Sequence, residues 1–149
     1  MRSAKKIAAT VGGSAHDVEA RFYEALQAGD LDRVMACWAD DDDVLCIHPG
    51  GPRLIGLGAI RASYEALLSQ GPLRISAQAV RSIDALASSV HSLRERLEML
   101  TPEGPLDVFV MVTNVFHKTA QGWRLVAHHA SPGGPRELQD ISDTPPVLH

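Results

Sequence analysis

The stretch that decides the fold is LDVFVMVTNVFHKT, residues 106–119. Its valines, phenylalanines and threonines favour an extended strand over a helix. Short links at residues 101–105 and 120–122 separate this stretch from the neighbouring stretches, in which side-chain character also alternates with a period of two residues. The sequence predicts four long strands, Leu73 to about Leu86, Ser89 to Leu100, Leu106 to Thr119 and Gly122 to Ser131. Consecutive strands with short links form an antiparallel meander.

The N-terminal half has the four-residue spacing of helices instead. Ser14 can cap a first helix, in which Val18, Phe22 and Leu26 share one face, and Gly29 ends it. Asp30 can cap a second helix, and a third is expected from about Gly58 to Leu68. A short strand, residues 44–47, ends before Pro49. The order predicts an α+β fold with three N-terminal helices on one face of a single curved, mostly antiparallel sheet.

Length and composition agree with one globular domain, expected at residues 15–132 of the 149. Residues 1–14 are interpreted as a disordered lead-in without a signal peptide, and residues 133–149 as a loosely ordered tail. The net charge is -4 and the basic residues are scattered, which argues against nucleic-acid binding. No run is long enough to cross a membrane, and Cys37 and Cys46 are too few for a disulfide framework. We expect a cytoplasmic protein.

The segment from Val108 to Thr113 is apolar on both of its faces. The helices can cover only one face of the sheet, so the other face needs a partner. We therefore expect a homodimer formed through the outer sheet face. The alternative is that the C-terminal tail folds back over this face.

Six short motifs appear in a characteristic order. They are FYEAL at residues 22–26, GDLD at 29–32, WADD at 38–41, AIR at 59–61, and GWRLV at 122–126 followed by HAS at 129–131. Over residues 15–132 this order resembles the SnoaL-like and ketosteroid-isomerase-like branch of the nuclear transport factor 2 (NTF2-like) superfamily. The resemblance implies a cone-shaped, cystatin-like α+β barrel with a pocket between helices and concave sheet, usually in a dimer.

The resemblance also implies positions for the steroid-isomerase machinery, and all three differ here. The oxyanion tyrosine falls on Phe22, the proton-shuttling aspartate on His48 and the late acid on Asn114. Phe22 has no hydroxyl, and the helix period directs Tyr23 away from the pocket. His48 is a competent general base near neutral pH, and the amide of Asn114 can donate a hydrogen bond to an oxyanion.

Several other side chains are expected around the pocket. Glu95 alternates with Leu93 and Leu97 and so faces inward, where it pairs with a cation or acts as an acid of raised pKa. The resemblance places His129 and Ser131 on the pocket side of the last strand. The expected ligand-binding set is Phe22, Trp38, Tyr64, Glu95, His129 and Ser131.

Each of these groups also has a simpler structural interpretation. His48 either lines the pocket or bonds a carbonyl in the turn that follows it. Asn114, in an apolar strand, is satisfied either by a ligand or water or by a cross-strand side chain. Trp38 is either a pocket wall or a core residue.

No metal and no cofactor is expected. His48, His91 and His129 lack an HxH or HxxxH pairing, and the acidic run at residues 40–43 lacks the spacing of a calcium loop. Ser-His-Asp order, phosphate loop and dinucleotide fingerprint are missing from the sequence.

Three functions remain open. The first is binding of a small, largely apolar molecule. The second is a proton-transfer enzyme of isomerase, dehydratase or cyclase type, with His48 as base and Asn114 as oxyanion donor. The third is a dimeric interaction module without a ligand.

Overall fold

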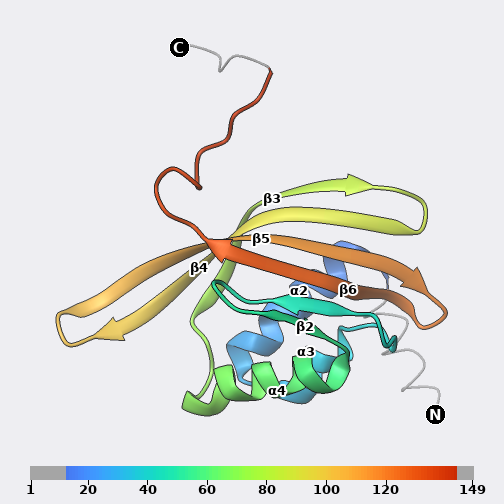
Figure 1. Cartoon of the computed structure of the whole chain (residues 1–149), viewed down its shortest axis with the longest axis horizontal. Coiled ribbons are helices and arrows are strands. Elements are labelled where there is room, and N and C mark those ends of the chain that lie inside the picture. Colours follow the sequence, from blue (N-terminus) through green and yellow to red (C-terminus); the bar gives the residue numbers. More distant parts are fainter. Residues whose placement is uncertain (1–12, 144–149) are drawn as a thin grey trace.

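The computed structural model describes residues 13–143, which form three helices and one sheet of six strands (Figure 1). The helices are α2 (Ala15–Ala28), α3 (Leu31–Ala36) and α4 (Leu57–Leu67), and α4 continues into a 3-10 turn at Leu68–Gln70. The strands are β1 (Leu45–Ile47), β2 (Arg53–Ile55), β3 (Ile75–Asp84), β4 (Ser88–Thr101), β5 (Gly104–Thr119) and β6 (Gly122–Pro132). The predicted lead-in lies outside the described residues except for Gly13 and Ser14.

The predicted pair of N-terminal helices is confirmed, together with its caps. Ser14 Oγ accepts a hydrogen bond from the Asp17 amide at 3.0 Å, which satisfies a free N–H of the first turn of α2. Gly29 ends the helix with φ of 68°, a left-handed conformation that glycine adopts without steric cost. Asp30 then caps α3 through the Arg33 amide at 3.2 Å. The two helices therefore pack as a hairpin against the sheet.

The predicted meander of four strands is also confirmed, since β3, β4, β5 and β6 pair antiparallel in sequence order. The sequence did not reveal β2, a three-residue strand that pairs with β1. Nor did it reveal that β1 lies parallel to β6, with Cys46 opposite His128. This pairing attaches the segment around His48 to the far end of the sheet.

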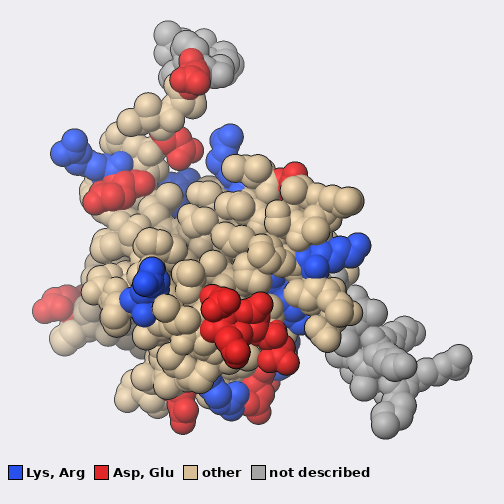
Figure 2. Space-filling view, turned by 45° about the vertical axis from the view of Figure 1, so that its right-hand side comes forward, with Lys and Arg blue, Asp and Glu red and all other residues tan. Residues whose placement is uncertain are grey.

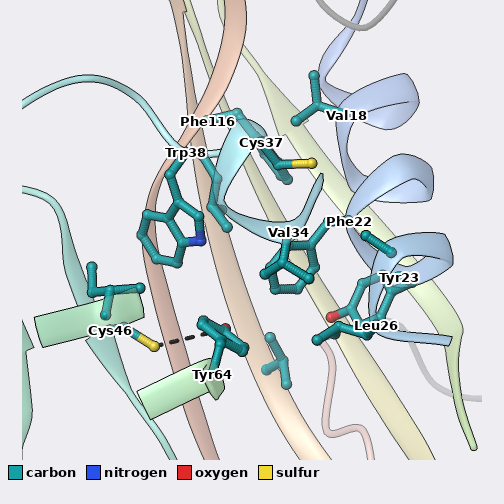
Figure 3. Packing of buried hydrophobic residues seen from close by; sticks show 14 of the residues in the cluster. Val18, Phe22, Tyr23, Leu26, Val34, Cys37, Trp38, Cys46, Tyr64 and Phe116 are labelled. Atoms are coloured by element: carbon teal, nitrogen blue, oxygen red, sulfur yellow. Dashed lines mark hydrogen bonds between the residues drawn. The ribbon is translucent and has the colours of Figure 1, made fainter. Parts of the chain in front are cut away.

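The helices lie on one face of the curved sheet, which does not close into a barrel (Figure 1). The core fills the space between them. In Figure 3, side chains of α2 and α4 meet there, and Phe22, Leu26 and Tyr64 point into the same space. The molecule is thus an α+β fold with three helices on a mixed sheet, as the sequence predicts.

The outer sheet face carries half-buried apolar side chains, among them Phe109 and Met111, which alternate with the core residues Val110 and Val112. The N–H of Gly133 donates to the carbonyl of Phe109 at 3.0 Å, and beyond it the described tail leaves the sheet (Figure 1). Ile141 in that tail is 97% exposed. Ile141 therefore does not cover the outer face.

Charged side chains are spread over the surface. On the face drawn in Figure 2, the described lysines and arginines are scattered, and several acidic side chains form one cluster while others lie apart from it. Among the described residues, no helix is both long and apolar enough to span a bilayer.

Candidate functional site

A cavity of about 110 Å³ lies between the helices and the concave face of the sheet. Most of its walls are apolar, and three polar side chains, His48, Glu95 and His128, reach it. The lining residues are Phe22, Leu26, His48, Pro49, Tyr64, Leu67, Leu73, Ile75, Glu95, Leu97, Val110 and His128. A partly enclosed apolar space with few polar groups is typical of a small-molecule site.

The structure brings together only part of the expected site. Phe22, His48, Tyr64 and Glu95 line the cavity. The other four expected residues, Trp38, Asn114, His129 and Ser131, do not.

Glu95 is the acidic group of the cavity. It projects from β4, is 6% exposed and accepts a hydrogen bond from the Tyr23 hydroxyl at 2.7 Å. Burial raises the pKa of its carboxyl to about 7, although the Tyr23 hydrogen bond opposes this shift. Near neutral pH this carboxyl therefore exchanges readily between a hydrogen-bond donor and a carboxylate.

Tyr23 does not line the cavity, in agreement with the expectation that the helix period turns it away from the pocket, but its side chain is buried in the core. Phe22 and Tyr23 are both buried, because α2 lies in a concave sheet that contacts a wide stripe of its surface. Burial raises the pKa of the Tyr23 phenol well above its ordinary value, which keeps the hydroxyl neutral. The hydroxyl that Phe22 lacks is thus supplied by the next residue, which donates to Glu95 rather than lining the cavity.

Asn114 has no free hydrogen for a ligand. Its Nδ2 donates to Glu19 Oε2 at 3.1 Å and to the Tyr23 hydroxyl at 3.4 Å, and its Oδ1 lies 2.6 Å from His128 Nδ1. Both amide hydrogens are therefore used by protein groups. The structure therefore does not bring Asn114 to the cavity, and its amide is bonded to Glu19, Tyr23 and His128 instead.

His128 reaches the cavity as a neutral imidazole. Because Asn114 Oδ1 can only accept, Nδ1 of His128 carries the hydrogen and Nε2 carries a lone pair. Burial lowers the pKa of this imidazole to about 3. His128 is therefore an acceptor, and it faces the same cavity as Glu95.

His48 lies at the mouth of the same cavity, where the chain turns after β1. Its Nε2 lies 2.9 Å from Ser63 Oγ, which itself donates to the carbonyl of Ile60 at 2.7 Å. Since the serine hydrogen is used there, Nε2 of His48 is the donor and Nδ1 is left as the basic atom. Burial lowers the pKa of His48, so its ring is neutral at pH 7. Of the two expected roles for His48, the structure shows the lining of the cavity.

Cys46 is a neighbour of His48 but not an activated nucleophile. Its Sγ lies 3.6 Å from His48 Nε2 and 3.8 Å from the Tyr64 hydroxyl (Figure 3). Burial raises the pKa of the thiol to about 11, so the reactive thiolate is scarce at neutral pH.

The expected inward phase of His129 and Ser131 is wrong because β6 contains a bulge. Phe116 pairs with Leu125 and Val115 pairs with Ala127, which leaves Val126 as an extra residue. One extra residue moves every later side chain to the opposite face. His128 consequently turns inward, and His129 and Ser131 lie on the outer face with Met111 and Thr113.

Trp38 is a core residue rather than a cavity wall. It is 4% exposed, forms a parallel bridge with Leu125 and packs within the apolar cluster. Its position at the end of α3 places it on the β6 side of the core, away from the cavity.

Sequence patterns did not identify Tyr23 and His128 as parts of the site. Strand alternation would have found Leu97 and Val110, which share the inner face with Glu95, but the bulge hid His128. Within the described residues, one set of three possible metal ligands, His16, Glu19 and His91, lies outside the cavity.

Comparison with known proteins identifies the family. The model of the SnoaL-like domain matches residues 16–135. A search of curated proteins found no match.

Similar solved structures agree with this assignment. One from Thiobacillus denitrificans, described provisionally as a calcium/calmodulin-dependent protein kinase type II association domain, is 36% identical, with a TM-score of 0.72 over 80% of this chain and 94% of that one. One from Streptomyces avermitilis, described provisionally as a dehydratase of the NTF2-like family, is 28% identical, with a TM-score of 0.69 over 77% and 90%. An NTF2-like protein of unknown function from Pseudomonas putida shares the fold at 16% identity, with a TM-score of 0.70 over 91% and 96%. With its buried α2 and meander enclosing a cavity, this chain belongs to the SnoaL-like family of the NTF2-like superfamily.

Proposed function

We propose that this protein binds a small, largely apolar molecule in the cavity and that the protonated carboxyl of Glu95 recognises a hydrogen-bond acceptor on it. The main support is the cavity itself, in which apolar walls surround a carboxyl whose pKa burial raises to about 7. A neutral carboxyl in an apolar site donates a hydrogen bond to a carbonyl or ether oxygen at little desolvation cost.

The size of the cavity sets the size of the ligand. An engineered apolar cavity of about 150 Å³ binds benzene. A space of about 110 Å³ therefore holds a molecule of roughly half a dozen non-hydrogen atoms, or the end of a larger one that extends through the mouth.

Cyclopentanone is a suitable probe, since it has an apolar ring and one acceptor oxygen. In a titration followed by 1H–15N NMR, we expect saturable shifts at the amides of cavity residues. Binding should weaken as the pH rises above 7, because the ketone needs the protonated form of Glu95.

Two neighbouring positions on β5 provide matched variants. Val110→Phe fills the cavity and should abolish binding, whereas Met111→Phe adds the same ring on the opposite face and should preserve it. Thermal melts of both variants check that they fold. Shifts that do not saturate in the wild type, or equal binding by both variants, would contradict the proposal.

A proton-transfer enzyme is a second candidate, favoured by the pKa of Glu95 close to 7 in a cavity that His48 also lines. Glu95 would donate a proton to a carbonyl oxygen, while His48 takes a proton from the adjacent carbon, which leaves an enol. His128, whose pKa is about 3, is too weak a base for this step. This differs from the sequence-based scheme, in which Asn114 was the donor. One similar structure is described provisionally as a dehydratase.

Exchange of the α-hydrogens of cyclopentanone in D2O tests this candidate. The wild type should accelerate exchange above the buffer rate, and Glu95→Gln should remove the acceleration. Binding without accelerated exchange would leave the protein as a binder and eliminate the enzyme.

We also propose a homodimer through the outer sheet face, supported by the half-buried apolar side chains Phe109 and Met111 on that face. A similar structure is described provisionally as an association domain. Light scattering after size exclusion should give twice the chain mass of 16.0 kDa for the wild type and a monomer for Met111→Lys. Leu86→Lys, at a residue that is 94% exposed, is the control and should remain dimeric. A monomeric wild type, or a dimeric Met111→Lys, would refute the interface.

A further inference from the structure

Three possible metal ligands meet at the start of α2, outside the cavity. His16 and Glu19 lie one turn apart on α2, and His91 projects from β4 beneath them. One ligand atom from each residue lies within 4.8 Å of the other two. The set combines two imidazoles and a carboxylate, a common donor set for zinc and ferrous iron.

His91 is buried without a hydrogen bond, which is unusual for an imidazole. Its exposure is 0%, and neither ring nitrogen has a hydrogen-bond partner. Nδ1 lies 3.0 Å from Glu19 Oε2, yet the N–H direction misses the oxygen. The ring packs between His16, at a centroid distance of 4.3 Å, and Phe116, at 4.8 Å. Buried polar groups in proteins almost always have a hydrogen-bond partner, and a bound ligand at His91 would explain this exception.

The surroundings of the cluster favour a cation. Glu19 is itself buried, at 5% exposure, and Asn114 Nδ2 donates to the same oxygen that faces His91. Asp84, at the end of β3, adds a second carboxylate on this side, where it accepts hydrogen bonds from Ser82 and Ser89.

We propose that His16, Glu19 and His91 bind one divalent transition-metal ion of the zinc type. Ligands that bind at about 2.0–2.2 Å lie about 2.8–3.1 Å from their neighbours around an octahedral ion and about 3.3–3.6 Å around a tetrahedral one. The pair formed by Glu19 and His91, at 3.0 Å, already has the octahedral spacing and is a few tenths of an ångström from the tetrahedral one.

His16 supplies the adjustable third ligand. Its side chain is exposed and its ring stacks on that of His91, with an angle of 29° between the planes. To bind the ion, the His16 ring rotates out of its stacked position on His91. This rotation also opens a route from solvent to the two buried ligands. The remaining coordination positions are filled by water.

Calorimetric titration of untagged, chelator-treated full-length protein with Zn2+ tests the site. We expect one equivalent to bind the wild type and His16→Ala to weaken its affinity at least tenfold. His117→Ala removes another exposed histidine, from the outer face of β5, and should leave the affinity unchanged. Because His16 is exposed, its replacement does not threaten the fold.

Two further readouts separate this site from nonspecific surface binding. Co2+ should produce visible absorption bands in the wild type that are lost in Glu19→Gln, and Zn2+ should raise the melting temperature of the wild type but not of His16→Ala. Absence of stoichiometric binding, or His16→Ala binding as tightly as the wild type, overturns the proposal. So does a loss of binding in His117→Ala alone.

Discussion

The carboxyl of Glu95 links the pH of the solution to the stability of the protein. Its pKa rises from an ordinary value of 4.5 to about 7 in the folded state, because burial penalises its charged form. Between these values the folded state holds a proton that the unfolded state has lost, so this residue lowers stability as the pH rises. The loss is complete above about pH 7.

We therefore predict that Glu95→Gln becomes more stable relative to the wild type as the pH rises from 4.5 to 8. The interval from 4.5 to about 7 corresponds to on the order of 3 kcal/mol of unfolding free energy. Urea denaturation of both proteins across this range measures the difference, in which the titrations of groups that do not interact with Glu95 cancel. A constant difference would show that Glu95 has an ordinary pKa.

Tyr23 holds this pKa down through its hydrogen bond of 2.7 Å to Glu95. Tyr23→Phe removes the donor and keeps the ring, so the pKa of Glu95 should rise above that of the wild type. Infrared difference spectra of the carboxyl stretch against pH would show this shift. An unchanged titration midpoint would mean that the hydroxyl does not interact with the carboxylate.

At the scale of the element, β6 shows where sequence interpretation fails. Its existence and limits follow from alternation and from the link at residues 120–122. Which of its residues face the core does not follow from the sequence, because nothing in the sequence marks Val126 as the bulged residue. Because His128 and His129 are adjacent, either phase of β6 directs a histidine toward the pocket, and the sequence alone does not distinguish the two phases.

Chemical modification distinguishes the two phases of β6. In the Met111→Lys variant, which is expected to be monomeric, diethylpyrocarbonate should modify the exposed His117 and His129, whereas the buried His128 and His91 should be protected. Mass spectrometry of the peptides gives the ratio. Faster modification of His128 than of His129 would contradict the bulge.

The start of α2 depends on its cap. Ser14→Ala removes the hydrogen bond to the Asp17 amide and should destabilise the protein by about 1 kcal/mol. Thermal or urea unfolding measures this effect. Ser69→Ala provides a matched control, because that exposed serine bonds only a nearby carbonyl of its own turn, and it should cost less.

At the scale of the whole molecule, local patterns predicted the elements and long-range contacts decided the site. Helices α2 and α3 and the meander follow from periodicity and caps. The parallel pairing of β1 with β6 and the bond from Asn114 to Glu19 join residues far apart in the sequence. Alternation could place Glu95 inward, but only the packing of α2 onto the sheet shows that Tyr23 meets it there.

The central claim is that the carboxyl of Glu95 lines a ligand-sized, largely apolar cavity, and a 13C NMR titration of that carboxyl with and without cyclopentanone tests it most directly. We predict a midpoint near pH 7 without the ketone and a higher midpoint with it, because the bound ketone excludes water and accepts the carboxyl hydrogen. A midpoint near 4.5 that the ketone does not change would mean that the carboxyl is hydrated and that the cavity does not bind this ligand.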